Sequence, residues 1–272
     1  MFEVFYSYVK QNVLPSFTEE QNAKFKAYFD ELTEWNKMFN LISFKNPEDI
    51  LYRHFADSLY ASKAVLSTLP ELCHSGLDPE SILSLSSEKS NCNLSIVNCK
   101  LPLKFADLGT GSGMPGIPVK IALPNIKMTL VESITKKCNF LENVNQKLSL
   151  DMEILNKRAE EIGQDKNYRA RYDCVLSRAV SKFSPNLEIS IPLLKTGGYF
   201  IVHKTKNSAQ SQEEGLPSIK NALNHLGAKL EKVIDYKLPG QDLDYCILIF
   251  KKHKDTPQQF PRKPGIPEKK PL

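Results

Sequence analysis

The sequence predicts an α/β protein in which a helical N-terminal part accompanies a seven-stranded, mostly parallel sheet. From residue 101 onward, apolar segments typical of strands alternate with amphipathic segments typical of helices. This alternation favours a parallel sheet covered by helices on both faces. A glycine-rich stretch follows the first strand, where such sheets bind ligands. The last two strands are separated only by PGQDLD, so we expect them to pair as an antiparallel hairpin.

Composition divides the 272-residue chain into four parts. Residues 1–66 are expected to be helical, and residues 67–100 form a serine-rich insertion or linker with little periodicity. Residues 101–252 carry the alternating pattern, and residues 253–272 form a basic, proline-rich tail. The net charge is +5, and the last 22 residues hold seven Lys or Arg against two acidic residues. This concentration suggests a polyanionic partner, although a solvated tail would show the same pattern.

Two helices are predicted within the N-terminal part. The first begins with Ser16 or Thr18 as its N-cap, and its apolar face contains Phe25, Tyr28, Phe29, Leu32 and Trp35. The second begins near Asn46, because Pro47 suits the first turn of a helix and two acidic residues follow it.

The alternating part predicts a definite order of elements. The expected strands are 104–109, 127–133, one beginning at 152, 172–179, 199–205, 228–238 and 244–252. The expected helices are 115–124, 135–150, 186–195 and 217–227. We expect the helix at 186–195 to close at Gly197 and Gly198, because glycine commonly ends helices.

The candidate ligand site is the stretch DLGTGSGMPG at residues 107–116. Its GSGMPG segment satisfies the dinucleotide pattern G-x-G-x-x-G, which taken alone is a weak signal. Asp107 would repel a pyrophosphate, and Pro115 and Pro118 remove amide donors that a phosphate would use. S-adenosylmethionine (SAM) carries a sulfonium and an ammonium group and no phosphate. The loop therefore predicts SAM as the cofactor.

Glu132 supports this interpretation. It ends the second strand about 20 residues after the loop, which is the place of the acidic residue that accepts hydrogen bonds from ribose hydroxyls. A solvent-exposed acid at a strand end is the alternative. The cofactor-binding candidates that follow from the residues themselves are Asp107, Gly111, Gly113 and Glu132.

Several segments carry a more specific pattern: FNLISFKNPEDILYRHFADSL, FADLGTGSGMPGIPVKIALPN, LVESITKKCNFLENV, RAEE, VLSRAV, LLKTGGYFIVHK and FPRKPGIPEKKPL. Together they resemble the RsmG family, also called GidB, over residues 12–66 and 101–272. The resemblance implies a Rossmann-like class I SAM-dependent methyltransferase fold. It also implies methylation of N7 of a guanine in 16S ribosomal RNA (rRNA), at guanine 527 in the 530 loop of the small ribosomal subunit. Residues 67–100 depart from the family, whose connection at this point is shorter.

The resemblance also implies further cofactor positions. Gly109 and Met114 match cofactor contacts in the glycine loop, and Ala159 and Glu160 match the pair that flanks the adenine. Arg178 matches an arginine at the end of the fourth strand. A salt bridge at the strand end is the alternative for Arg178.

The expected chemistry needs no general base, because guanine N7 has an in-plane lone pair and no proton. The enzyme must position the base in line with the methyl group and stabilise the positive charge that moves onto the purine. Arg53, His54 and Asp57 are candidates for holding the RNA or the base, since Arg53 and Asp57 are four residues apart on a predicted helix. The alternative is an intrahelical ion pair beside a capping histidine.

Phosphate contacts are predicted from basic residues near the site and in the tail. The candidates are Lys136, Lys137, Arg158, Lys204, Arg262 and Lys263. Because the major groove of an RNA stem is too narrow for side chains, we expect the target guanine in an irregular or splayed segment.

Other classes of protein are disfavoured. No apolar run is long enough to span a bilayer, and the first residues lack the features of a signal peptide, so we expect a cytoplasmic protein, most simply a monomer. Cys73, His74, Cys92 and Cys99 match no familiar zinc spacing, so no metal is predicted. The open alternatives are a methyltransferase of another RNA, a non-catalytic RNA-binding protein, and an NAD(P)-dependent oxidoreductase suggested by GSGMPG.

Overall fold

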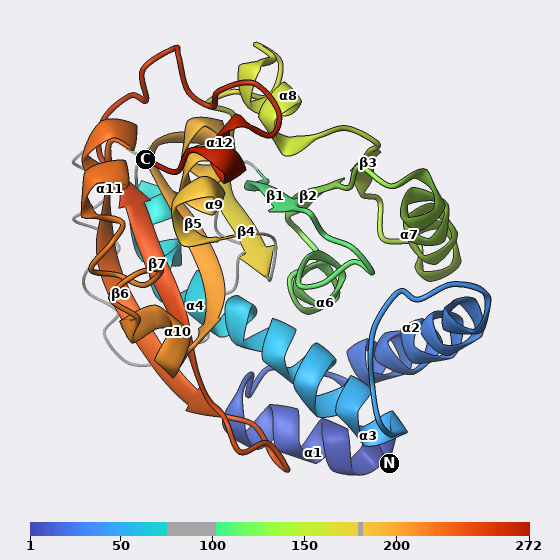
Figure 1. The fold of residues 1–272 in the computed structure, drawn as a ribbon. Coiled ribbons are helices and arrows are strands. Elements are labelled where there is room, and N and C mark those ends of the chain that lie inside the picture. Colours follow the sequence, from blue (N-terminus) through green and yellow to red (C-terminus); the bar gives the residue numbers. More distant parts are fainter. Residues whose placement is uncertain (75–101, 179–181) are drawn as a thin grey trace.

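The computed structural model of the chain describes residues 1–74, 102–178 and 182–272. Most of the expected insertion at 67–100, including Cys92 and Cys99, lies outside these ranges. One twisted sheet runs through the molecule, with the N-terminal helices and α6 and α7 on one side and α8, α9 and α11 on the other (Figure 1).

The sheet has the strand order β3-β2-β1-β4-β5-β7-β6. The first five strands in this order are parallel, and β7 is antiparallel to both β5 and β6. The predicted seven-stranded sheet with a C-terminal antiparallel hairpin is therefore confirmed. The bounds are β1 Lys104–Leu108, β2 Lys127–Val131, β3 Glu153–Leu155, β4 Tyr172–Arg178, β5 Leu194–Thr205, β6 Ala228–Lys237 and β7 Asp244–Lys252.

Two hydrophobic cores separate the sheet from its helical layers. Neighbouring residues of β5 show the division, because Ile201 belongs to the core under the N-terminal helices and Val202 to the core under α9. The helices are α1 Phe2–Asn12, α2 Glu19–Met38, α3 Pro47–Asp49, α4 Asp57–His74, α6 Gly116–Ala122, α7 Thr135–Leu148, α8 Ala159–Gln164, α9 Phe183–Ser190, α10 Lys206–Gln210, α11 Lys220–Leu226 and α12 Ile266–Lys269.

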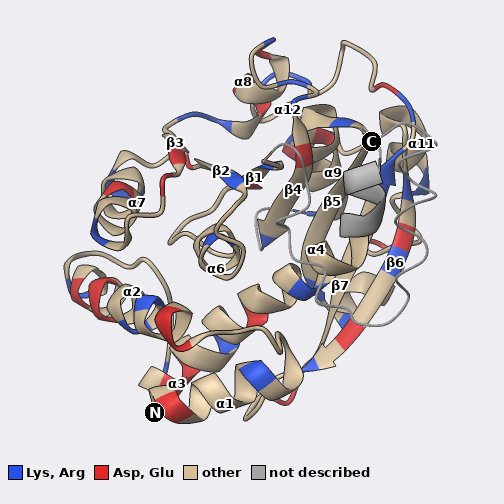
Figure 2. Ribbon diagram, turned by 180° about the vertical axis from the view of Figure 1, so that it is seen from behind, with Lys and Arg blue, Asp and Glu red and all other residues tan. Residues whose placement is uncertain are grey.

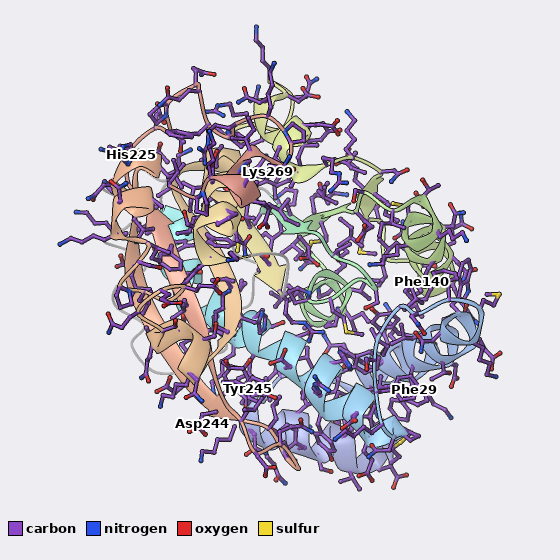
Figure 3. All side chains as sticks on the ribbon, in the orientation of Figure 1. Phe29, Phe140, His225, Asp244, Tyr245 and Lys269 are labelled. Carbon is purple, nitrogen blue, oxygen red and sulfur yellow. The ribbon has the colours of Figure 1, made fainter. Side chains whose placement is uncertain are left out.

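The N-terminal helices pack on the sheet domain through aromatic side chains. Thr18 is the N-cap of α2 and forms a capping box with Gln21, as its position before two glutamates suggests. From this helix Tyr28 and Trp35 contact Phe140 of α7, with ring centroids 6.4 and 5.7 Å apart. Figure 3 labels Phe140 on α7 and Phe29 on α2, where the two helices lie side by side.

The second predicted helix begins as expected but does not continue as a plain α-helix. Asn46 caps it by accepting a hydrogen bond from the amide of Asp49, and Pro47 occupies the first turn. Residues Ile50–Ala56 then form a π-helix before α4 begins at Asp57. Because a π-helix has more residues per turn than an α-helix, the side chains of Arg53 and Asp57 do not pair as an α-helical spacing predicts.

The helix expected at 186–195 is wrong in both boundaries. The structure has α9 at Phe183–Ser190, a 3₁₀ turn at Ile191–Leu193, and β5 from Leu194 onward. Pro192 has no amide donor and disfavours helical backbone before it, which explains the early end. Gly197 and Gly198 lie within β5, where Gly197 has a φ of 91° and the pairing with β4 shifts register.

The C-terminal segment after β7 returns across the molecule and ends in α12, beside α9 (Figure 1). Over the part of the chain that the structure describes, no helix is both long and apolar enough to cross a bilayer. The described cysteines Cys138, Cys174 and Cys246 are buried and unpaired.

Candidate active site

The glycine loop connects β1 to α6 at the carboxyl edge of the sheet. Gly109, Gly111 and Gly113 have φ values of 61°, 60° and 92°, a backbone region that favours glycine. Gly116 is needed for a different reason, since a Cβ there would lie 2.4 Å from Leu130 and 2.8 Å from Asp107. The loop therefore needs both unusual backbone conformation and close packing.

Asp107 lies beneath this loop. Its Oδ2 accepts hydrogen bonds from the Thr110 hydroxyl at 2.5 Å and from the Gly116 amide at 2.8 Å. Its Oδ1 is buried and has no hydrogen-bond partner in the described part of the chain. Burial raises the pKa of this carboxyl to about 7, although its hydrogen bonds and Arg178 act in the opposite direction. A buried oxygen that lacks a donor suits a cationic or hydrogen-bonding ligand.

Glu132 follows β2 and holds the outer side of the same loop. Its Oε2 accepts from the Gly111 amide at 3.0 Å and its Oε1 accepts from the Ile134 amide at 2.9 Å. The side chain is buried, which fixes it beside the loop. Each carboxylate oxygen has capacity for a second hydrogen bond, so Glu132 can still accept from ribose hydroxyls.

An open cavity of about 160 Å³ lies beside this carboxylate. Its lining brings together Gly109, Glu132, Arg158, Ala159 and Glu160, all of which were candidates from the sequence. The remaining lining residues are Val131, Ser133, Lys157, Pro185, Ile189, Pro267 and Glu268. The apolar members suit the faces of a purine, and two members come from the C-terminal segment, which sequence reasoning did not place here.

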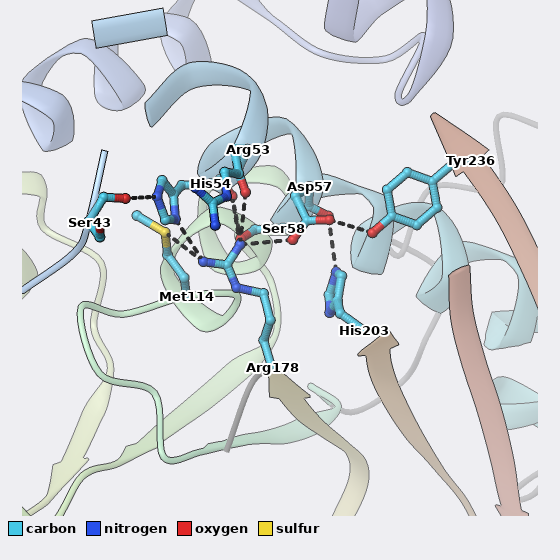
Figure 4. Close-up of polar contacts among 9 residues, drawn as sticks. All are labelled: Ser43, Arg53, His54, Asp57, Ser58, Met114, Arg178, His203 and Tyr236. Carbon is cyan, nitrogen blue, oxygen red and sulfur yellow. Dashed lines mark hydrogen bonds and ion pairs between the residues drawn. The ribbon is translucent and has the colours of Figure 1, made fainter. Parts of the chain in front are cut away.

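Arg178, at the end of β4, is the centre of a polar cluster (Figure 4). Its Nη1 donates to Asp57 Oδ2 at 2.8 Å, and its Nη2 lies 3.0 Å from His54 Nδ1 and 3.6 Å from Met114 Sδ. It also donates to the carbonyl oxygens of Arg53 and His54. The alternative that the sequence left open for Arg178, a salt bridge at the strand end, is thus present, and it joins the glycine loop to the N-terminal helices.

His54 is neutral in this cluster. Burial and the neighbouring Arg178 lower the pKa of its imidazole to about 4. Because the Arg178 guanidinium can only donate, His54 Nδ1 is the acceptor, and Nε2 therefore carries the proton and donates to the Ser43 carbonyl at 3.2 Å. Both ring nitrogens are engaged.

Asp57 is also fully engaged, and its place differs from the one expected for an RNA contact. Its Oδ2 pairs with Arg178, its Oδ1 accepts from the Tyr236 hydroxyl, and its backbone carbonyl accepts from His203 Nε2 at 3.0 Å. The side chain is buried. Asp57 thus positions Arg178 and does not face the solvent. Its carboxylate pairs with Arg178 and not with Arg53, so the intrahelical ion pair that was the alternative does not form.

Comparisons with known proteins decide the family. The model of the rRNA small subunit methyltransferase G family, GidB, matches residues 21–73 and 90–232. A relative of that name from Desulfitobacterium hafniense is 38% identical over 93% of this chain and 90% of its own length. Others from Lysinibacillus sphaericus and Streptococcus pneumoniae are 36% and 35% identical, over 94% and 99% of this chain and 92% and 99% of their own lengths.

The chain belongs to this family. The sequence-based resemblance to RsmG is confirmed, as are the Rossmann-like class I methyltransferase fold and SAM as cofactor. The oxidoreductase suggested by GSGMPG is set aside, because membership in a methyltransferase family accounts for the loop. The lining of the cavity fits SAM, since Glu132 offers acceptors for the ribose and the apolar side chains form a slot for the purine, while the buried carboxyl of Asp107 lies beneath the adjoining loop.

The predicted RNA-binding residues differ in how far their side chains are exposed to solvent. Lys136 and Arg158 are exposed, and Lys137 is half-buried near Gly111. Lys and Arg in blue mark the segment before α8 and parts of α7 in Figure 2. Lys204 is half-buried, and its ammonium lies 4.9 Å from the centre of the Phe183 ring.

Arg262 does not fit the predicted phosphate role. Its guanidinium donates to both carboxylate oxygens of Glu188, at 2.8 and 2.5 Å, and Glu188 is completely buried. A buried carboxylate needs a fixed cation, so Arg262 is a tether of the C-terminal segment. Lys263 beside it is exposed and keeps its candidacy.

Sequence reasoning missed several residues of this region. Tyr236 of β6 and His203 of β5 form hydrogen bonds with Asp57, and no local sequence pattern predicts these contacts. Glu188 did carry a signal, since an acidic residue inside the apolar run LEISI needs a buried cation as partner.

Proposed function

We propose that the protein transfers the methyl group of SAM to N7 of a guanine in 16S rRNA, and that this guanine lies in the 530 loop of the small subunit. The observation that carries the proposal is the engagement of His54 and Asp57. Neither side chain is free to remove a proton from a nucleophile. Guanine N7 attacks through a lone pair and needs no base, so positioning and electrostatics suffice.

The cofactor's orientation follows from the chemistry of the lining. We place the ribose hydroxyls on Glu132 and the adenine in the apolar slot that includes Ala159 and Glu160. The methionine part then extends along Gly109 toward Met114, with Asp107 beneath the loop. SAM supplies the electrophilic methyl group when bound, and this chain's residues hold the reactants in line and exclude water.

The RNA is proposed to approach over the polar cluster and the exposed basic residues. Arg53 is exposed directly beside the engaged His54, and its carbonyl is held by Arg178. Arg158 lines the cofactor cavity, and Lys136 lies in the first turn of α7, just after Glu132; both are exposed and suit phosphate contacts. We further propose that the enzyme acts as a monomer in the cytoplasm, where rRNA is assembled; sedimentation of the purified protein tests the first point.

The decisive experiment measures transfer of a tritiated methyl group from SAM to small-subunit rRNA that lacks this modification, with the labelled base mapped. The matched control is the same RNA fragment with 7-deazaguanosine at the target, because carbon replaces N7 there and nothing else changes. Label on guanosine and none on 7-deazaguanosine supports the proposal. Label on both, or on another RNA alone, contradicts it.

Arg53 provides a second test that separates RNA positioning from cofactor binding. Arg53→Ala should leave SAM affinity unchanged and reduce methylation of rRNA by at least about tenfold, the effect of losing one positioning contact. Lys220→Ala is the control, because it also removes an exposed cation, but from α11, which does not line the cofactor cavity. Equal turnover by the two variants would reject the role of Arg53.

A further inference from the structure

The C-terminal segment is fastened to the sheet domain at its beginning by Arg169. The guanidinium of this residue donates to the carbonyl oxygens of Thr256, Pro257 and Phe260 at 2.9, 3.1 and 2.5 Å. Gly163 of α8 lies against the same stretch so closely that a Cβ would be 2.5 Å from Pro261. The path of the chain up to residue 261 is therefore fixed.

Further anchors hold the rest of the segment over the carboxyl edge of the sheet. Arg262 pairs with the buried Glu188, and the Gly265 amide donates to Glu160 Oε1 at 3.1 Å. At the end of the chain the Leu272 amide donates to the Ser184 hydroxyl at 3.1 Å. Lys269 in Figure 3 marks α12 between these anchors, beside α9.

These anchors bring α12 to the cofactor cavity. Pro267 is buried and Glu268 is exposed, and both line the cavity that contains Glu132 and Ala159. The cavity's apolar lining outside the sheet comes from Ala159 of α8, from Pro185 and Ile189 of α9 and from Pro267. Without the segment, one apolar side of the slot would be open to solvent.

We propose that residues 265–268 form the outer wall of the adenosine pocket and retain the cofactor once it is bound, with Pro267 contacting the purine. The proposal rests on the placement of adenine given above. Glu160 connects the two, because it lines the cavity while its carboxylate accepts a hydrogen bond from the Gly265 amide. Movement of the wall and orientation of Glu160 are therefore linked.

The size of the cavity gives the wall a kinetic role. Its volume of about 160 Å³ is below the roughly 300 Å³ at which small-molecule pockets begin. The wall is short, and it is held mainly by side-chain anchors at its two ends. The wall therefore covers one side of an open cavity and slows the release of bound SAM.

Two variants test the wall, one shortened and one with a single substitution in the full-length protein. The first ends the chain after Lys263, which keeps Arg262 on Glu188 and removes Gly265, Pro267 and Glu268. The second is Pro267→Ala, with Pro271→Ala as matched control, because Pro271 is exposed and does not line the cavity. Stopped-flow dissociation and calorimetry are measured with SAM and with methylthioadenosine, which has the adenosine but lacks the amino-acid part.

We expect the shortened chain to release both ligands at least about tenfold faster and to bind both more weakly by a similar factor. Pro267→Ala should show a smaller change in the same direction, and Pro271→Ala none. Unchanged dissociation, tighter binding, or an effect on SAM without one on methylthioadenosine would overturn the proposal. Failure of the unaltered protein to bind SAM would instead count against the proposed function.

Discussion

Arg178 at the end of β4 and Asp57 at the start of α4 form an ion pair of 2.8 Å whose side chains are both largely buried. The pair joins the N-terminal helices to the parallel sheet at the edge that carries the proposed cofactor site. Asp57 is further fixed by Tyr236 of the C-terminal hairpin, so three parts of the chain converge on one carboxylate. This convergence fixes the position of the N-terminal helices relative to the glycine loop, which Arg178 contacts through Met114.

Removal of Asp57 should therefore be costly. Asp57→Ala leaves the Arg178 guanidinium buried without its partner, and we expect the free energy of unfolding to fall by about 3 kcal/mol. Urea unfolding monitored by circular dichroism measures the change. Glu34→Ala removes the exposed ion pair with Lys37 and should cost less than about 1 kcal/mol. Similar losses of unfolding free energy in the two variants would show that the buried pair contributes no more to stability than the exposed one.

Glu132 should matter for the cofactor. In the unaltered protein both carboxylate oxygens of Glu132 accept from backbone amides. In Glu132→Gln an NH₂ group replaces one of these oxygens and faces a backbone N–H, so one hydrogen bond is lost. The side chain also loses its negative charge and becomes a weaker acceptor for the ribose hydroxyls. We expect SAM affinity to fall by about 10- to 100-fold, as for loss of one or two charge-assisted hydrogen bonds. Calorimetric titration checks this. Glu161→Gln, a change at an exposed side chain in the first turn of α8, should bind SAM normally.

The pH dependence of SAM binding should report on Asp107. The pKa of its carboxyl is about 7 in the folded protein, against an ordinary value of 3.8, so the free protein holds a proton there between about pH 4 and 7 that the unfolded chain lacks. This group therefore makes the free protein less stable as pH rises through that window. A cationic ligand favours the carboxylate, so SAM affinity should rise with pH up to about 7, by at most about tenfold per pH unit, and then level off.

Asp107→Asn provides the comparison for this prediction, because the amide keeps the size of the side chain and cannot ionise. Calorimetry from pH 5.5 to 7.5 should give a rising affinity for the unaltered protein and a flat profile for the variant. A flat profile in both proteins would mean that Asp107 does not sense the charge of SAM.

Salt dependence of rRNA binding should separate phosphate contacts from tethers. Lys136→Ala removes an exposed cation, and we expect the slope of log affinity against log salt to decrease in magnitude by about one. Arg262→Ala should leave that slope unchanged and lower the free energy of unfolding by about 3 kcal/mol, because Glu188 stays buried without its cation. The reverse pattern would restore Arg262 as a phosphate ligand.

The alternation of apolar segments was sufficient to predict the sheet and its hairpin, because each buried strand is a short apolar run that can be recognised from its own residues. The N-cap at Thr18 and the strand-end Glu132 were predictable for the same reason. The end of α9 was mispredicted, because two glycines resembled a helix cap while Pro192 had already ended the helix. The conformational preference of glycine cannot show that Gly197 and Gly198 belong to β5, which pairs with β4.

The polar cluster and the C-terminal segment depend on contacts between distant parts of the chain. The π-helix at Ile50–Ala56 places Asp57 toward Arg178, more than a hundred residues away, so helical periodicity alone assigned it to the wrong neighbour. The basic tail was interpreted through its charge, although Arg262 is neutralised by Glu188. In both cases a buried carboxylate, Asp57 or Glu188, pairs with an arginine from an element distant in the sequence.

The wall proposed at residues 265–268 follows the last strand of the sheet, so all seven strands can form without it. Damage to the wall would leave a protein that looks intact by circular dichroism. Only its grip on the methyl donor would reveal the defect.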